Sequence, residues 1–417
     1  MVKDPNASCA TCATRAISRW ARSARAARTA VVLGASVVGC SNSSSGGSGG
    51  GNDASVADAP VGSEAAAQDS GAGPDSSSND GSGMADVGSS PDAGDAGTGN
   101  IVIADQYNNR VIEIDPSGHI VWTFGDGSQV PGPTSVVGPN DQERLPNGQT
   151  LIAGTGIPGP MAGCTLDAGC PDNRVLIVDH DGGIVWQYGD DGGLSVPVCS
   201  VYLPNGNVLI TDQGNARIVE VTQAKTIAWT YQPLAADGGP ALNSPNSAER
   251  LANGNTLITD ENNNRVLEIA NDGGTVWQYP AASSDAGLLS GAAFASRLPS
   301  GNTLITSANN ALVLEVDTNG NVVWSYNTAT RTLGTGTDAG VVDGGNAMPL
   351  PTRAVRLANG DTLISDQLNN QVIQVNQTGQ IVFQYGQLNT AGNAAGQLNG
   401  PYDAKRVGDF TGLTPPQ

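Results

Sequence analysis

Short apolar runs separated by turn residues fill the chain from residue 99 onward, and residues 247–279 show the pattern most clearly. Asn253-Gly254 and residues 271–274 mark tight turns, because Asn and Gly tolerate the positive φ that such turns demand. Between the turns lie runs rich in β-branched, aliphatic and aromatic residues, which predict strands. The predicted strands are 247–251, 256–259, 265–269 and 275–279, with a polar loop at 260–264. This unit is therefore expected to form a four-stranded antiparallel sheet.

The same unit recurs, and the recurrence predicts the fold. Its first turn begins at Leu145, Leu203, Leu251, Leu298 and Leu357. Its last strand carries a recurring aromatic residue, at Trp122, Trp186, Trp229, Trp277, Trp324 and Phe383. The shorter intervals are near the roughly 40 to 45 residues of a four-stranded propeller blade. Six units predict an all-β six-bladed β-propeller of four-stranded blades, in which each blade buries both faces against its neighbours.

The two ends of the repeat region predict how the ring closes. The first unit lacks its inner strand and begins at Gly99-Asn100, whereas residues 398–407 supply a surplus strand whose sequence closely matches residues 242–251. We therefore expect the C-terminal strand to complete the first blade. The propeller is predicted over residues 99–410, followed by a short tail at 411–417.

The N-terminal segment predicts an exported, membrane-attached protein. Residues 1–28 contain six Lys or Arg and one acid, and the apolar run that follows is too short to span a bilayer. Val37-Val38-Gly39-Cys40 resembles the bacterial lipobox, which makes residues 1–39 a lipoprotein signal peptide and Cys40 the lipid attachment site. An ordinary signal peptide is the alternative. Ser41 after the cysteine implies sorting to the outer membrane, with a periplasmic or cell-surface location.

Composition predicts a disordered segment after the signal peptide and excludes one class of partner. Residues 40–98 are rich in Ser, Gly, Ala and Asp and contain no aromatic residue, Lys or Arg. Such a segment cannot offset its own ordering entropy, so we expect a disordered acidic tether. The whole chain has a formal net charge of −20. A strongly acidic protein repels nucleic acid, which leaves the membrane and a protein, glycan or small molecule as partners.

The remaining cysteines predict a disulfide. Cys164 and Cys170 lie in a long loop rich in Gly and Pro, and an oxidising compartment favours a bond between them. Cys199 begins the next inner strand on the same end of the ring, so a Cys170–Cys199 bond is the alternative. No His or second Cys pair flanks these thiols at the spacing of zinc ligands, and we assign no metal site.

Strand alternation sorts the loops onto two ends of the ring. The tight turns fall on one end, here named the turn end. The polar loops and the connections between blades fall on the other, here named the loop end. The loop end carries the long variable segments, at 125–139, 154–173, 231–245, 280–293 and 327–349. Because binding usually occurs on variable loops of a rigid scaffold, the loop end is the candidate functional face.

Two recurring polar patterns could carry chemistry. Asp-x-x-Asn-x-Arg begins at Asp105, Asp212 and Asp260, with a variant at Asp366. A pattern repeated in most blades favours local bracing of each loop, and calcium binding is the alternative. An arginine also recurs on the inner strand, at Arg144, Arg250, Arg297, Arg356 and Arg406. Around a central channel these arginines would form an anion-binding ring, and pairing with acids such as Glu143 and Glu249 is the alternative.

The repeats LPNGNVLITDQGNARIVEV and LANGNTLITDENNNRVLEI, each followed by an aromatic strand, resemble NHL-type repeats. They resemble still more the repeats of bacterial arylsulfotransferase-like propellers, which implies the propeller fold over residues 99–407. Arylsulfotransferases use channel histidines and NHL-type lyases use histidine-bound zinc, whereas His119 and His180 of this chain lie in tight turns at the turn end.

The sequence therefore favours a non-catalytic binding or scaffold module without a cofactor, and we assign no catalytic residue. A divergent arylsulfotransferase-like enzyme, or a metal-assisted hydrolase or lyase, is the alternative. In that case a site would be built from Asp side chains, but no pair of them stands out along the chain.

Overall fold

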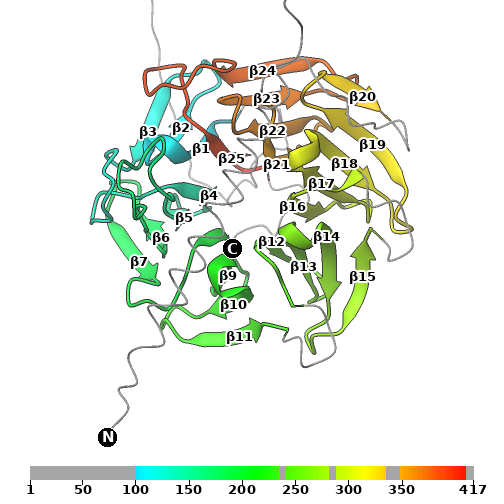
Figure 1. The fold of residues 1–417 in the computed structure, drawn as a ribbon, viewed down its shortest axis with the longest axis horizontal. Coiled ribbons are helices and arrows are strands. Elements are labelled where there is room, and N and C mark those ends of the chain that lie inside the picture. Colours follow the sequence, from blue (N-terminus) through cyan, green and yellow to red (C-terminus); the bar gives the residue numbers. More distant parts are fainter. Residues whose placement is uncertain (1–98, 234–240, 281–287, 335–347, 410–417) are drawn as a thin grey trace, which may run out of the picture. The chain divides into compact units, whose positions relative to one another are not determined.

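The computed structural model describes residues 99–233, 241–280, 288–334 and 348–409. These residues form six antiparallel sheets arranged as the blades of a ring (Figure 1), which confirms the six-bladed all-β propeller. Four predictions lie outside the described residues: the signal peptide, the lipid attachment site at Cys40, the tether and the tail at 411–417. Within the described ranges, no helix has both the length and the apolar composition that a bilayer crossing requires.

Each blade runs from an inner strand at the channel to an outer strand at the rim. Blade one consists of β25 (Pro401–Arg406), β1 (Ile101–Asp105), β2 (Arg110–Ile114) and β3 (Ile120–Phe124). Blade two consists of β4 (Pro139–Arg144), β5 (Thr150–Gly154), β6 (Arg174–Val178) and β7 (Ile184–Tyr188). Blade three consists of β8 (Pro197–Tyr202), β9 (Val208–Asp212), β10 (Arg217–Val221) and β11 (Ile227–Tyr231).

The other half of the ring follows the same order. Blade four consists of β12 (Pro245–Arg250), β13 (Thr256–Asp260), β14 (Arg265–Ile269) and β15 (Thr275–Tyr279). Blade five consists of β16 (Ala292–Arg297), β17 (Thr303–Ser307), β18 (Leu312–Val316), β19 (Val322–Asn327) and a fifth strand, β20 (Thr332–Gly334). Blade six consists of β21 (Pro351–Arg356), β22 (Thr362–Asp366), β23 (Gln371–Val375) and β24 (Ile381–Gly386).

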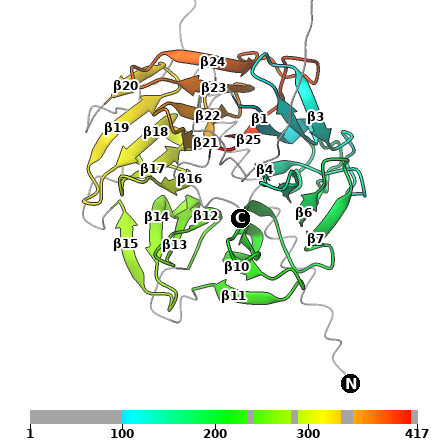
Figure 2. The ribbon, with the colours of Figure 1, turned by 180° about the vertical axis from the view of Figure 1, so that it is seen from behind.

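The ring closes as the sequence predicts. β25 pairs antiparallel with β1, from Ile101 opposite Arg406 to Asp105 opposite Pro401. Both ribbon views show the red C-terminal strand beside the cyan N-terminal one (Figures 1 and 2). The two terminal segments of the propeller therefore share one sheet, and β25 pairs with the inner edge of β1 at the seam.

Short 3-10 helices occupy the polar loops between the second and third strands of several blades. They are η2 (Gln106–Asn108), η3 (Gln213–Asn215), η5 (Glu261–Asn263) and η7 (Ala308–Asn310). These helices and the fifth strand of blade five are features that the sequence pattern did not predict.

Apolar contacts at the junctions between blades hold the ring together. Six hydrophobic clusters each join one blade to the next. At the first junction, for example, Val102 and Trp122 of blade one pack against Ile152 and Leu176 of blade two. Burying one such aliphatic side chain contributes about 1.5–3 kcal/mol. The second strands are buried along their whole length because both of their faces meet a neighbouring blade.

Candidate functional site

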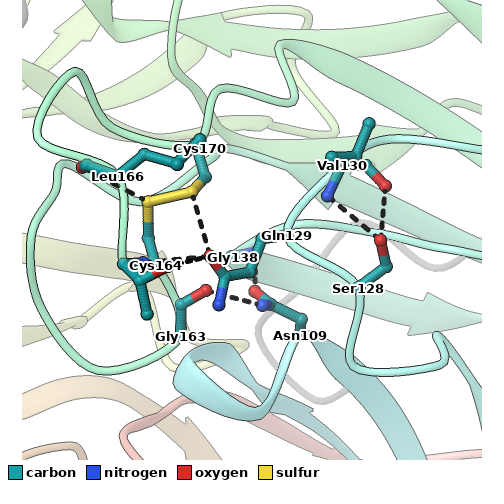
Figure 3. The surroundings of a disulfide bond; sticks show 10 residues. Asn109, Ser128, Gln129, Val130, Gly138, Gly163, Cys164, Leu166 and Cys170 are labelled. Atoms are coloured by element: carbon teal, nitrogen blue, oxygen red, sulfur yellow. Dashed lines mark hydrogen bonds between the residues drawn. A yellow bond between two sulfur atoms is a disulfide. The ribbon is translucent and has the colours of Figure 1, made fainter.

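A disulfide fixes the loop at residues 154–173 on the loop end. The bond joins Cys164 to Cys170, the pairing favoured from the sequence, with their Cα atoms 5.8 Å apart (Figure 3). Both cysteines are buried in a small apolar cluster with Val137 and Ile157. Ile157 and Cys170 also exchange two backbone hydrogen bonds, of 2.9 and 2.8 Å. The loop therefore forms a fixed platform, here named the disulfide platform.

The disulfide platform is joined to loops of the first blade (Figure 3). Asn109 Nδ2 donates to a carbonyl of the platform at 2.8 Å, and Gln129 Oε1 accepts from the Thr165 backbone N–H at 3.0 Å. On the same two loops Val130 is 64% exposed and Leu166 is 52% exposed. Both side chains are therefore accessible at the loop end.

Side chains of one blade satisfy the inner strand of the next. The innermost strand of each sheet has an edge without a partner strand, and its backbone N–H groups need acceptors. Asp141 Oδ2 of β4 accepts from the Ser200 N–H of β8 at 2.7 Å. Glu249 Oε2 of β12 accepts from the Arg297 N–H of β16 at 3.0 Å. Burial raises the pKa of Glu249 to about 8, against the opposing effect of this hydrogen bond.

Charged side chains meet on the channel axis where blades one, two and six converge. Arg353 Nη2 lies 3.3 Å from Asp141 Oδ1, and Arg353 Nε lies 3.7 Å from Asp403 Oδ1. Lys405 Nζ lies 2.8 Å from Asp141 and 3.0 Å from Asp403. All four side chains are buried. Burial opposes ionisation of Asp141, but Lys405 and Arg353 hold its pKa below the ordinary value. These four residues, here named the axis cluster, balance two cations with two carboxylates.

Two hydrogen bonds join opposite blades across the channel. Arg353 Nη2 of blade six donates to the Val198 carbonyl of blade three at 3.4 Å. Asn246 Nδ2 of blade four donates to the Tyr402 hydroxyl of blade one at 2.8 Å. The Arg353 guanidinium also lies over the Phe294 ring of blade five, 4.7 Å from its centroid. Side chains from opposite sides therefore touch, and the channel is filled at these two levels.

Cys199 lies beside this axis and is not part of the disulfide. Its thiol is free and buried. Burial, together with the nearby Asp141 carboxylate, raises the pKa of Cys199 to about 12. A thiol that is enclosed and protonated is a poor nucleophile, so Cys199 has the properties of a structural residue.

The loop-end mouth of the channel is lined with polar groups. A β-bulge between Pro245 and Ser247 leaves Asn246 out of register, and such bulges re-aim a side chain. Asn246 Nδ2 donates to Glu261 Oε2 at 2.9 Å as well as to the Tyr402 hydroxyl. Burial raises the pKa of the half-buried Glu261, although the Asn246 hydrogen bond opposes this effect. Glu261 and Tyr402 thus place a carboxyl group and a hydroxyl group on one shared amide.

The Asp-x-x-Asn-x-Arg pattern braces its own loop. Asp260 Oδ2 accepts from Asn263 Nδ2 and from Arg265 Nε, each at 2.7 Å, and Oδ1 accepts a backbone N–H of the preceding connection at 2.6 Å. The same contacts recur around Asp105 and Asp212. Hydrogen-bond donors of the protein thus occupy the oxygens of these carboxylates. This arrangement favours a role in bracing the loop over a role in binding calcium. In the part of the chain that the structure describes, no three His, Cys, Asp or Glu side chains form a metal-binding group.

The five recurring arginines lie at the blade junctions and not around the channel, so the expected ring in the channel does not form. Each reaches the third strand of the preceding blade, in the pairs Arg144–Glu113, Arg250–Glu220, Arg297–Glu268, Arg356–Glu315 and Arg406–Gln374. The alternative, pairing with acids, is confirmed for four of the five arginines, although the acids are on the preceding blade and are not Glu143 or Glu249. Side chains alternate along a strand, so the sixth residue of an inner strand faces the preceding blade while the third and fifth face the next.

An aromatic ring completes most of these junctions. The Arg250 guanidinium lies 4.6 Å from the Trp229 ring centroid, and Arg356 lies 4.5 Å from that of Trp324. A cation over an indole face contributes about 0.5–1 kcal/mol where water has access. We name each set of arginine, acceptor and aromatic ring a junction clamp. The junction between blades two and three has an apolar set in the same places: Ile177, Trp186 and Tyr202.

The two histidines lie in turns at the turn end, as expected. His119 follows β2 and His180 follows β6. His119 Nδ1 is 3.2 Å from Asp115 Oδ2, and both side chains reach solvent. The axis cluster, in contrast, was not predicted from the sequence. One feature of the sequence could have indicated it. At the third position of the inner strand, half of the blades carry a charged residue and half carry an uncharged one.

Comparison with known families gives a partial match. Residues 171–347 match the family model described as outer membrane protein assembly factor BamB. That stretch covers the end of blade two through blade five. No curated protein matches the chain.

Many solved structures are similar to the chain at low identity. A protein of unknown function from Bacteroides caccae is 14% identical, with 69% of this chain and 93% of that chain covered and a TM-score of 0.49. Virginiamycin B lyase from Staphylococcus aureus is 16% identical, with 62% and 75% covered and a TM-score of 0.41. A functionally unknown protein from Desulfotomaculum acetoxidans is 13% identical, with 73% and 84% covered and a TM-score of 0.40.

Proposed function

We propose that this protein is a non-catalytic binding or scaffold module of the cell envelope, anchored to the outer membrane through lipidated Cys40, that engages its partner through the loop end. The closure of the channel carries this proposal. Arg353 and Asn246 bond to blades on the opposite side of the ring, so a ligand meets the outer surfaces of the propeller and not an open axial pocket. Binding is therefore assigned to a surface, as is usual for loops on a rigid scaffold.

The disulfide platform supports the choice of the loop end. It is cross-linked, tied to blade one, and presents the exposed side chain of Leu166, while Val130 is exposed on the neighbouring loop. The partial family match supports the same class of function, because that family is described as an outer membrane protein assembly factor. We infer that the partner is a protein or another component of the outer membrane or periplasm.

Crosslinking tests the face. A photoreactive amino acid is introduced at Val130 or Leu166 on the loop end, and at His119 or His180 on the turn end as matched controls. We expect a discrete crosslinked species from the loop-end positions in intact cells and none from the turn-end positions. Crosslinking from the turn end alone, or from no position, would contradict the proposal.

Metabolic labelling tests the anchor. Cells that express the chain are fed an alkyne fatty acid, and the mature protein is probed for the label. Cys40→Ala is expected to remove both the label and the membrane association, because no second acyl site is predicted. Cys199→Ala is the control and should keep both. An unlabelled wild-type protein in the soluble fraction would exclude the lipid anchor.

The enzymatic alternative has one specific observation in its favour. Glu261, whose pKa is raised by burial, shares Asn246 with the Tyr402 hydroxyl, and a perturbed carboxyl at a channel mouth is a feature of catalytic acids and bases. A panel of aryl sulfates, esters and lactones tests this alternative, with calcium and with chelator in parallel. Turnover that Glu261→Gln abolishes would establish the enzyme and displace the binding module.

A further inference from the structure

A groove of about 370 Å³ opens on the flank of the propeller between blades three and four. Trp229 and Tyr231 of β11 form one wall, with ring centroids 6.4 Å apart and an angle of 10° between their planes. Asn271, Asp272 and Thr275, from the turn between β14 and β15 and from the start of β15, line the other wall. The groove thus sets a flat two-ring surface against a row of polar side chains.

The first departure from the repeat at this junction concerns the tryptophan. In blades one, two and four the indole Nε1 closes the junction by donating to a carbonyl in the turn of the next blade, whereas in blade five Trp324 Nε1 is buried and has no hydrogen-bond partner. Trp122 donates to the His180 carbonyl at 2.9 Å, and Trp186 donates to the Gln223 carbonyl at 3.2 Å. Trp277 makes the same contact with Thr318 at 3.3 Å. Trp229 Nε1 donates no hydrogen bond to any of the residues that the structure describes, and the indole lines the groove.

The second departure concerns the neighbouring tyrosine. Tyr188, Tyr279, Tyr326 and Tyr385 occupy the same repeat position and are buried. Tyr231 is half-buried and lines the groove. Tyr231 therefore loses the cover that its four equivalents have, whereas Trp229 is half-buried like Trp277 and Trp324.

The far side of the Trp229 ring is fixed from behind. The Arg250 guanidinium lies 4.6 Å from the indole centroid, and Arg250 Nη1 donates to Asn271 Oδ1 at 3.1 Å. The aromatic wall and the polar wall are thus tied to one side chain. A preorganised wall does not have to be ordered when a ligand binds, which lowers the entropic cost of binding.

We propose that this groove binds a saccharide. A pyranose ring has one face of C–H groups, which packs on an aromatic plane, and a rim of hydroxyls, which needs amide, carboxylate and hydroxyl partners. Trp229 and Tyr231 supply the plane over a length that suits two consecutive sugar rings. Asn271, Asp272 and Thr275 supply donors and acceptors for the hydroxyl rim. Binding pockets generally combine an apolar surface with a few placed polar groups in this way.

A proline-rich peptide is the main competitor for an aromatic groove, because such peptides also dock on exposed Trp and Tyr side chains. Peptide grooves of that kind are lined mainly by aromatic residues. Here the second wall is exposed and hydrophilic throughout, with Asn271, Asp272 and Thr275 all open to solvent. This chemistry favours a polyhydroxylated ligand.

Binding to an array of defined oligosaccharides tests the proposal with the full mature chain. Trp229→Phe keeps an apolar ring in the junction but removes the Nε1 donor and part of the stacking surface, and Asp272→Ala removes a carboxylate from the opposite wall. Each is expected to raise the Kd for the captured saccharide by about tenfold or more. The matched controls are Trp277→Phe in the next blade and Asp181→Ala in the equivalent turn of blade two, and both should bind like the wild type.

Each outcome of the binding test either supports or overturns the proposal. Loss in the two groove variants with retention in the two controls supports the proposal. Failure to bind any oligosaccharide, equal binding by all four variants, or capture of a proline-rich peptide in place of a saccharide would overturn it. Thermal melts of the four variants exclude unfolding as the cause of a loss. The loop-end crosslinks from Val130 are expected to persist in Trp229→Phe, so this test can fail without affecting the function proposed for the loop end.

Discussion

The axis cluster and the junction clamps both consist of charged side chains between blades, yet they differ in burial and in repetition. The pair of an arginine and an acceptor on the preceding blade recurs at five of the six junctions, and an aromatic ring completes the clamp at four of them. The axis cluster occurs once, is buried throughout, and joins Arg353 of blade six to blades one, two and three. Repeated charges therefore do the same local job in each blade, whereas unique charges close the ring across its centre.

The flank between blades three and four also departs from the repeat. The clamp of Arg250, Glu220 and Trp229 is present there, but Tyr231 is half-buried, whereas the equivalent tyrosines of four other blades are buried. Because the other parts of the junction keep the repeat, the departure is local and leaves the fold intact. Departures from a repeat, more than the repeat itself, mark the candidate binding surfaces of this protein.

The largest effect is expected from Arg353→Met. The substitution leaves Asp141 and Asp403 with one cation where they have two, in a site without water access. Breaking a buried ion pair from one side costs about 3 to 5 kcal/mol of unfolding free energy. Equilibrium unfolding in guanidinium measures the loss, and Arg356→Met in a junction clamp is the matched control, with an expected loss of about 1 kcal/mol.

Equal losses in the two variants would contradict the distinction between axis and clamp. If Arg353→Met does not fold, Arg353→Lys keeps a cation in place and is expected to fold with a smaller loss. A stable Arg353→Met protein with an unchanged unfolding free energy would show that the axis cluster does not stabilise the fold.

A pH effect of intermediate size is expected from Glu249. Burial raises the pKa of its carboxyl from an ordinary value of 4.5 to about 8 in the folded protein. Between those values the unfolded chain releases the proton while the folded protein keeps it, so the unfolding free energy falls as the pH rises. Glu249→Gln can still accept from the Arg297 N–H and does not titrate. Across this pH range we expect the unfolding free energy of Glu249→Gln to fall by on the order of 2 kcal/mol less than that of the wild type.

Thermal melts of both proteins between about pH 4.5 and pH 8 measure this difference. The two stability curves should meet near the acid end and separate towards the alkaline end, with the variant more stable there. Curves that stay parallel over the whole range would show that Glu249 does not titrate in this way.

The smallest effect is expected within the clamps. A double-mutant cycle on Arg356 and Glu315 should give a coupling of about 1 kcal/mol that weakens as salt is added, because the pair is partly exposed. The same cycle on Arg406 and Gln374 is the matched comparison, since the acceptor there is a neutral amide at 2.7 Å. Its coupling should be smaller and insensitive to salt. The opposite salt dependence would show that the clamps are not held by charge.

Much of the fold could be predicted from the sequence because the same pattern of strands and turns occurs several times along the chain. The strands predicted at 265–269 and 275–279 match β14 and β15, and the pairing of β25 with β1 follows from the surplus strand at the C-terminus. Local turn chemistry and apolar runs act over a few residues, so a single chain can reveal them. The fifth strand of blade five rests on sheet pairing at the rim, which has no local pattern.

The candidate site was harder to predict because its contacts are long-range. Arg353 meets Asp141, which is more than two hundred residues away in the chain, and nothing near either residue indicates the pairing. The arginines of the clamps were placed in the channel because their strand, but not the direction of their side chains, was known. Direction depends on which neighbouring blade a given face meets, and only the closed ring determines that.

The reactivity of Cys199 tests the central claim most directly, because its thiol lies beside the axis that Arg353 and Asn246 close. In the mature chain with Cys40→Ser, Cys199 is the remaining free thiol, and its reaction with a small disulfide reagent is followed in native buffer. We expect no reaction in the folded protein, full reaction after unfolding in guanidinium, and a gain of native reactivity in Arg353→Lys. Prompt labelling of the folded wild-type protein would mean that the channel is open, and would contradict the assignment of binding to the outer surfaces.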